Sequence, residues 1–241
     1  MSINVFKKDT QANGNFNNGK ILEKKPIGFP QDGGNLKPYS NLFYWAHAWA
    51  PTEDSIIGLH PHRGFEICSF VLKGEIEHYD TLLDKWITLK KGDVQVIKAG
   101  RGISHSEKLK EGSEIFQIWF DPNIIESLYV DPSYSDFKSE IFHKEKTNGV
   151  EVKTISNKEN QICLESSGIQ IFEYEIVDKR YTHKIEKDSY HSLFILSGNL
   201  IIDNKQINEG DFVIIKNEKD LELLISKKCK FFEIVSPIIP P

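Results

Sequence analysis

The chain has 241 residues, a length that allows one large β domain or two domains of ordinary size. Hydrophobic residues make up 39% and charged residues 27%, which supplies enough apolar material for a core and excludes a disordered chain. The formal net charge of -5 argues against direct binding of nucleic acid, because such binding depends on clustered Lys and Arg.

The sequence also bears on location and redox state. No stretch approaches the ~18 uncharged apolar residues that cross a bilayer, and the opening MSINVFKKDTQANGNF lacks the apolar region of a signal peptide. We therefore expect a cytoplasmic protein that makes no membrane contact. Cys68, Cys163 and Cys229 are odd in number and show no CxxC spacing, so we expect reduced cysteines that pack as small apolar residues.

The first thirty-odd residues are rich in Gly, Asn and Pro, which predicts loops with at most one short strand. After them, short runs rich in Val, Ile, Phe, Tyr and Trp alternate with polar residues, so the predicted class is all-β. In residues 39–51 the large side chains Phe43, Trp45, His47 and Trp49 share one face of a predicted strand. That face either lines an aromatic pocket or fills a core.

A repeat links the two halves of the chain. FVLKGEIEH (70–78) precedes ITLKKGDVQVI (87–97), and FILSGNLII (194–202) precedes KQINEGDFVII (205–215). Each copy reads as a strand, a Gly turn, a second strand and a Gly-Asp turn before a further strand. We predict two β domains, residues 1–135 and 136–241. Residues 121–140, with two Asp-Pro pairs and one helical turn, form the predicted crossover.

The segment LHPHRGFEICSF (59–70) places two histidines two residues apart. Alternate residues of a strand point to one face, so His60 and His62 can present both imidazoles to one point. In the same register Gly64, Glu66 and Cys68 are predicted to face inward.

A second pair follows in GDVQVIKAGRGISHSEK (92–108), where His105 and Glu107 are again two residues apart after a Gly-rich turn. With eight histidines in the chain, an isolated HxH is weak evidence. The succession of HxH, a hairpin, a Gly-Asp turn and HxE is far more specific. It predicts a metal site between the two segments.

HPHRGFE and AGRGISHSE, with KGDVQV between them, resemble the signature of the pirin family of two-barrel cupins. The resemblance is close over residues 58–122, and looser over the rest through the repeat. It implies a cupin barrel, a double-stranded β-helix, in each half. It also implies metal ligands at four positions: His60, His62, His105 and Glu107.

Three imidazoles and one carboxylate suit Fe(II), Cu(II), Ni(II) or Mn(II), with positions left for substrate or dioxygen. The resemblance favours Fe(II), while Zn(II) accepts the same ligands and would give an inert or hydrolytic centre. Glu66 is then expected to orient an imidazole, although in many other cupins a carboxylate at this spacing is itself a ligand.

The second half shows no ligand set at the corresponding offsets. An offset of 124 aligns Lys184 and Glu186 with the first histidine pair, and an offset of 118 aligns Leu223 and Ile225 with the second pair. His183 and His191 match neither position and are interpreted as surface or core histidines. We therefore expect a second barrel without metal ligands.

The resemblance implies an oxidoreductase of the quercetin 2,3-dioxygenase type, which opens a flavonol ring with dioxygen. Glu107 or a neighbour would accept the proton of the substrate hydroxyl. The alternative is a non-enzymatic, iron-binding redox sensor that modulates protein partners. A different aromatic substrate is also compatible with the same fold and ligands.

Overall fold

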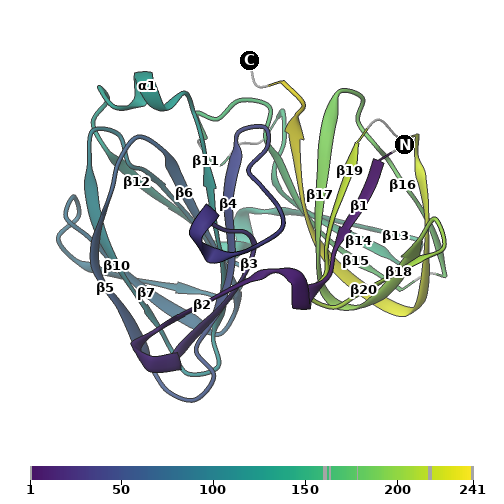
Figure 1. The fold of residues 1–241 in the computed structure, drawn as a ribbon, viewed down its shortest axis with the longest axis horizontal. Helices are drawn as coiled ribbons and strands as arrows, with labels where there is room; N and C mark the ends of the chain where they lie inside the picture. Colours follow the sequence, from purple (N-terminus) through teal and green to yellow (C-terminus); the bar gives the residue numbers. More distant parts are fainter. Residues whose placement is uncertain (1, 160–161, 163, 178, 217–218, 240–241) are drawn as a thin grey trace. The chain divides into compact units, whose positions relative to one another are not determined.

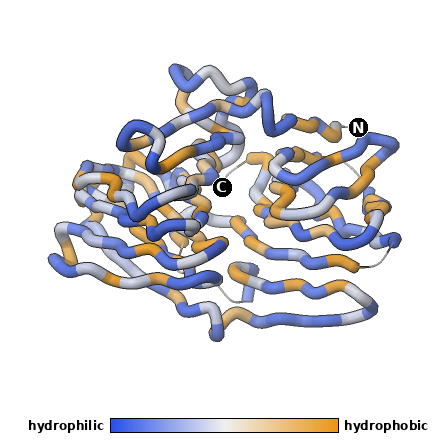
Figure 2. The backbone as a smooth tube through the Cα atoms, turned by 90° about the horizontal axis from the view of Figure 1, so that it is seen from below, coloured by the Kyte–Doolittle hydropathy of each residue, from blue (hydrophilic) through white to orange (hydrophobic). Residues whose placement is uncertain are grey.

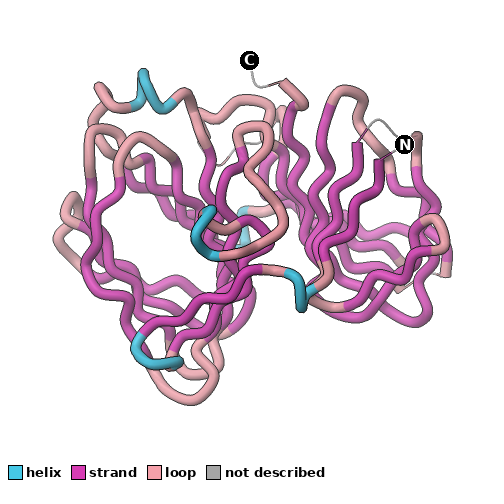
Figure 3. Tube along the Cα trace, in the orientation of Figure 1, coloured by secondary structure: helices cyan, strands magenta, loops and turns pink. Residues whose placement is uncertain are grey.

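The computed structural model describes residues 2–159, 162, 164–177, 179–216 and 219–239. Strands dominate this part of the chain (Figure 3), which confirms the predicted all-β class. It divides into two compact units, and each forms a β-barrel. The first barrel comprises residues 11–141 and 164–166, and the second comprises the described residues of 1–10, 142–162 and 167–241. None of the helices described is long and apolar enough to cross a bilayer.

The first barrel consists of two sheets (Figure 1). One sheet has the strand order β5-β10-β7-β8 and the other the order β12-β9-β6-β11-β4-β3-β2. The strands are β2 (Ala12–Phe16), β3 (Ile21–Ile27), β4 (Leu42–Trp49), β5 (Ser55–His62), β6 (Glu66–Lys73), β7 (Glu75–Asp80), β8 (Trp86–Lys90), β9 (Val94–Lys98), β10 (Ile103–Leu109), β11 (Glu114–Phe120) and β12 (Ser133–Phe137).

The second barrel is one extensively paired sheet, with the order β1-β19-β17-β20-β15-β14-β13 and with β16 and β18 joined at its sides. Apolar and polar residues alternate along much of the chain (Figure 2), as expected for strands with one face buried. The strands are β1 (Ser2–Phe6), β13 (His143–Thr147), β14 (Val150–Ser156), β15 (Gln170–Ile176), β16 (Arg180–His183), β17 (Ser189–Ile202), β18 (Lys205–Asn208), β19 (Phe212–Lys216) and β20 (Leu221–Pro237).

The prediction of loops in the first thirty-odd residues was wrong, because this segment contains β1, β2 and β3. Strand β1 pairs with β19 of the second barrel, whereas β2 and β3 extend a sheet of the first. Some of the Asn, Gly and Pro residues that suggested loops lie in the short 3-10 turns η2 (Asn17–Gly19) and η3 (Pro30–Asp32), and others lie inside β2. A further 3-10 turn, η1 (Lys8–Thr10), lies between β1 and β2.

The two copies of the internal repeat share an equivalent backbone hydrogen bond at their Gly-Asp turns. The Gly92 N–H donates to the Val71 carbonyl at 2.7 Å, and the Gly210 N–H donates to the Ile195 carbonyl at 2.8 Å. Both glycines have positive φ, 90° and 83°, a conformation that residues with a Cβ rarely adopt. Each barrel therefore uses the same turn to lead into its next strand, β9 or β19.

The predicted helical turn in the crossover is α1 (Ile124–Ser127), and the 3-10 turn η4 (Ser139–Ile141) ends the first barrel. Strand β12 lies between these two turns and pairs with β9, so much of the predicted crossover belongs to the first barrel. Cys68 and Cys229 are buried and free, as expected for reduced cysteines, and Cys163 lies outside the described residues.

Candidate metal centre

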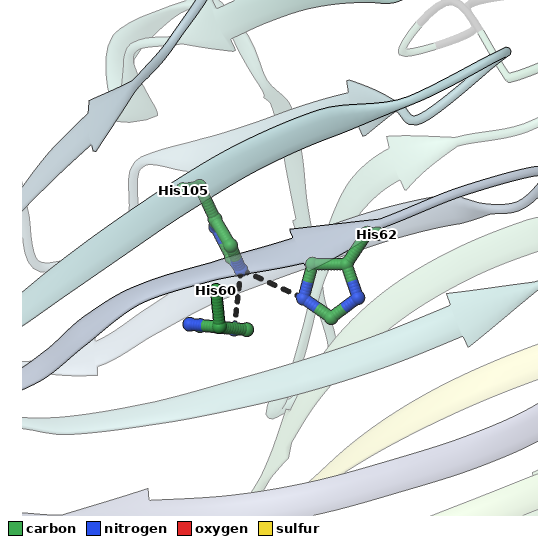
Figure 4. Close-up of side chains that lie close together, drawn as sticks. All are labelled: His60, His62 and His105. Atoms are coloured by element: carbon green, nitrogen blue, oxygen red, sulfur yellow. Dashed lines mark hydrogen bonds between the residues drawn. The ribbon is translucent and has the colours of Figure 1, made fainter.

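Three imidazoles converge inside the first barrel (Figure 4). His60 and His62 come from β5, and His105 comes from the antiparallel neighbour β10, where it is paired directly with His60. Nε2 of His105 lies 3.0 Å from Nε2 of His60 and 3.0 Å from Nε2 of His62. The two-residue spacing in β5 thus acts as predicted and directs both rings to one point.

The tautomer of His60 leaves its inward nitrogen free to bind a cation. Its Nδ1–H donates to the Gly58 carbonyl at 2.8 Å, so in the neutral ring Nε2 carries the lone pair. Burial and the neighbouring imidazoles lower the pKa of His62 to about 3 and that of His105 to about 2. His62 and His105 therefore favour the neutral form in which a histidine binds a metal.

The donor set fits a divalent transition metal. One ring proton can bridge one of the two 3.0 Å N···N contacts but not both, and facing lone pairs repel each other. A cation bound at about 2.1 Å from two imidazole nitrogens at a right angle separates those nitrogens by about 3.0 Å. Each of the two observed contacts therefore has the spacing of two neighbouring ligands of one ion.

Glu107 lies near this centre but is held by other groups. Its carboxylate accepts hydrogen bonds from Ser69 Oγ, Gln95 Nε2 and Gln117 Nε2. Its ligand atoms group with those of His78 and His105 rather than with the complete set of three histidines. A register shift between His105 and Glu107 in β10 accompanies this placement.

The pair His78 and Asp80 on β7, the strand that pairs with β10 beside His105, was not predicted from the sequence. Both side chains are fully buried, and His78 Nε2 lies 2.7 Å from Asp80 Oδ2. Asp80 Oδ1 also accepts the backbone N–H groups of Leu82 and Leu83, which fixes the carboxylate. The available signal was a His and an Asp two residues apart in a predicted strand.

The prediction that Glu66 faces inward and orients an imidazole was wrong. Its carboxylate accepts hydrogen bonds from the N–H of Glu165 and from the N–H and Oγ–H of Ser166. Gly64, with φ of 86°, lies in the turn between β5 and β6, so the alternation of β5 does not continue into β6. Ser69 faces the centre instead, and burial raises the pKa of Glu66.

A cavity of about 440 Å³ opens beside the three histidines. His60, His62 and Glu107 form part of its lining, and aromatic rings form much of the rest. Of the two interpretations of the β4 face that carries Trp45 and His47, core packing holds, since both side chains pack against Phe116. The opposite face, with Tyr44 and Ala48, lines the cavity. The aromatic lining consists of Phe16, Phe29, Tyr44 and Trp119.

Strand register also revises the correspondence between the two barrels. In the first barrel His60 pairs with His105 and His62 with Ile103. In the second, Tyr181 pairs with Leu223 and His183 with Leu221, and the offset of 118 relates these two leucines to His105 and Ile103. The positions that match the β5 histidines are therefore Tyr181 and His183, not Lys184 and Glu186.

His183 is part of a buried group with His191 and Glu233. His183 Nε2 and His191 Nδ1 lie 2.8 and 2.7 Å from Glu233 Oε1. The backbone N–H of Glu186 donates to His191 Nε2 at 2.8 Å, so Nδ1 of a neutral His191 carries the proton and donates to Glu233. This proton arrangement identifies a hydrogen-bonded core network rather than three open ligands.

The two barrels and their repeat define a bicupin. The fold is similar to a crystal structure of the bacterial pirin YhhW from Escherichia coli in complex with nickel(II), with a TM-score of 0.79 and 19% sequence identity. The superposition covers 99% of this chain and 100% of that one. Residues 27–120 match the Pirin family model, which confirms the resemblance noted in the sequence.

Two curated relatives extend the comparison. Pirin-like protein 2 of Arabidopsis thaliana is 41% identical over 112 residues, which cover 46% of this chain and 32% of the relative. Quercetin 2,3-dioxygenase of Escherichia coli K12 is 25% identical over 171 residues, covering 69% of this chain and 70% of that enzyme. The chain thus spans about a third of the length of the Arabidopsis relative.

Proposed function

We propose that the protein is a mononuclear metal oxidoreductase of the quercetin 2,3-dioxygenase type, which opens a flavonol ring with dioxygen. The observation that carries the proposal is the convergence of three imidazoles at 3.0 Å contacts beside an aromatic cavity. The similarity to an enzyme named quercetin 2,3-dioxygenase supports the same reading.

In this proposal His60, His62 and His105 hold one divalent ion through Nε2, and Glu107 is the carboxylate ligand. Fe(II) is the metal that we favour among the first-row ions that accept this ligand set. Bound there, the metal would act as a Lewis acid that lowers the pKa of a substrate hydroxyl. Ser69, Gln95 and Gln117 orient the Glu107 carboxylate toward this task.

The cavity suits a planar aromatic substrate. Tyr44 and Trp119 are stacked with ring centroids 4.2 Å apart, and Phe29 lies 5.1 Å from Tyr44. Such rings bind a flat ligand by offset or edge contacts and exclude water from the neighbouring metal centre. A flavonol presents a planar ring system together with an acidic hydroxyl next to a carbonyl.

The test combines metal analysis with oxygen uptake. Purified protein is loaded with Fe(II), its metal content is measured, and oxygen consumption is followed with a panel of flavonols. We expect one ion per chain and flavonol-dependent uptake in the wild type. The His60→Ala variant should lose both, because it removes a ligand whose tautomer is already set for binding.

His143→Ala is the matched control, since His143 is exposed on β13 of the second barrel. It should retain metal and oxygen uptake. Equal oxygen consumption by the wild type and His60→Ala would contradict the dioxygenase proposal. Stoichiometric iron without uptake on any flavonol would instead favour the redox-sensing role.

A further inference from the structure

Strand β3 carries two charged side chains into the first barrel. Ile21, Glu23 and Lys25 occupy the inward positions of this strand, and Glu23 and Lys25 are only 7% and 8% exposed. Both line the aromatic cavity that also contains His60 and Glu107. Charges are buried at considerable cost, so a buried pair in a ligand cavity points to a role in binding.

One cation serves two carboxylates in this group. Lys25 Nζ lies 3.3 Å from Glu23 Oε2 and 3.2 Å from Asp32 Oδ2. Asp32 Oδ2 also accepts the N–H of Phe29 at 2.9 Å. With all three groups ionised the formal charge is -1, because one Lys25 ammonium faces two carboxylates.

Glu23 keeps one oxygen for a ligand. Within the described chain, its ion pair with Lys25 engages Oε2, and no donor is found for Oε1. Burial raises the pKa of Glu23, and the nearby Glu107 adds to the rise, while Lys25 opposes it. A carboxylate in such surroundings is stabilised by a further hydrogen-bond donor.

Strand β2, which pairs with β3, leaves room for Glu23 and Lys25 by placing a glycine beside them. Gly14 of β2 is paired with Glu23, and a Cβ at Gly14 would lie 2.3 Å from Glu23 Oε2 and 3.0 Å from Lys25 Nζ. Any larger residue at position 14 would displace the ion pair. The position of Glu23 and Lys25 in the cavity wall therefore depends on a glycine at position 14.

We propose that Glu23 is a specificity-determining residue that accepts a hydrogen bond from a hydroxyl group of a neutral planar phenol, while Lys25 and Asp32 fix its position. A ligand that places a carboxylate next to Glu23 is disfavoured, because two negative charges would then face each other. The inference rests on the proposed function, since it takes the cavity beside the metal centre as the substrate site.

The test measures binding by calorimetry with Fe(II)-loaded protein under nitrogen. Three probes share one ring system: quercetin, 3-hydroxyflavone without the distal hydroxyls, and a 3-hydroxyflavone bearing a distal carboxylate. Wild type should prefer quercetin over 3-hydroxyflavone. Glu23→Gln should reduce that preference about fivefold, because a hydrogen bond to a charged acceptor is replaced by one to a neutral amide. The same variant should bind the carboxylate probe more tightly than the wild type.

Glu114→Gln is the matched control, because Glu114 pairs with His47 and Lys73 and does not line the cavity. It should leave the binding of all three probes unchanged. Gly14→Ala provides a second variant that keeps every charge but displaces Glu23, and it should also weaken the preference for quercetin.

The outcomes separate the two proposals. If wild type binds quercetin and Glu23→Gln changes the three affinities by the same factor, or not at all, this inference is overturned while the proposed function stands. If wild type binds none of the flavonols, the proposed function fails and the inference fails with it. Opposite shifts for the hydroxylated and carboxylated probes would support the inference, because a purely structural defect would weaken both.

Discussion

Nε2 of His62 lies 3.0 Å from Nε2 of His105, although burial and mutual repulsion keep both rings from taking up a proton. One ring proton can bridge this contact, but the contact between His105 Nε2 and His60 Nε2 then has facing lone pairs, a cost that a cation bound between the rings would remove. If the three histidines hold an ion as proposed, the stability of the first barrel should depend on that ion, and this dependence can be measured.

Removal of the metal should lower the thermal stability of the first barrel. An ion present at 100 times its dissociation constant stabilises the native state by about 2.7 kcal/mol. We expect Fe(II) or Ni(II) to raise the unfolding temperature of the wild type and a chelator to reverse the rise. His105→Ala should show no ion-dependent shift, whereas His143→Ala should shift like the wild type; an equal shift in both variants would count against the site.

The support of Glu107 by Gln117 should govern metal affinity. Gln117 Nε2 donates to Glu107, and Gln117 Oε1 accepts the Trp119 Nε1–H at 3.2 Å. Loss of a partner that orients a ligand typically weakens metal binding about 10- to 100-fold. Gln117→Leu should show such a loss in a competition titration with a chromophoric chelator. Gln206→Leu, on the exposed strand β18, should bind as the wild type does, and an unchanged affinity in Gln117→Leu would remove Glu107 from the ligand set.

Ser166 should stabilise the first barrel through Glu66 without affecting the metal. Its N–H and Oγ–H both donate to the buried Glu66 carboxylate. Ser166→Ala removes one hydrogen bond to a charged acceptor, which costs about 2 kcal/mol. Chemical denaturation should show that loss at unchanged metal affinity, with the exposed Ser133→Ala as control. A fall in metal affinity would restore the idea that Glu66 acts on the centre.

The network around Glu233 should make the second barrel sensitive to acid. The two histidines lower the pKa of this buried carboxyl from 4.5 to about 2, against the effect of burial. A lowered folded-state pKa stabilises the fold fully above the unfolded value, and this contribution is lost as pH falls from about 4.5 toward 2. The difference corresponds to about 3 kcal/mol.

Urea denaturation between pH 6 and pH 3 checks this expectation. Glu233→Gln should be less stable than the wild type at pH 6 and should lose less stability on acidification, because it lacks the titrating group. Glu209→Gln, an exposed substitution before the Gly210 turn, should follow the wild-type pH profile. Parallel profiles for the wild type and Glu233→Gln would show that the carboxyl does not control acid stability.

The direction of a side chain could be predicted from the sequence only where the strand that carries it is uninterrupted. The histidine convergence was predictable because His60 and His62 lie within one continuous strand, where two-residue spacing fixes direction. The orientation of Glu66 was not, because the turn at Gly64 interrupts the alternation.

Strand β3 was not predicted, because charged residues occupy two of its inward positions. Its inward positions after Ile21 are Glu23 and Lys25, so the apolar alternation that marks a half-buried strand is missing. The His183–His191–Glu233 group was hidden because its members come from three strands, and only their pairing brings them together.

The pairing of β1 with β19 has a practical consequence for dissecting the chain. A fragment that starts at residue 142 would contain most of the second barrel but would leave the backbone groups of Phe212–Lys216 open along one side. An exposed strand edge of this kind can pair with another copy of the fragment, so we expect the fragment to self-associate. A peptide of the first ten residues, supplied separately, should dock there and return the fragment to a monomer.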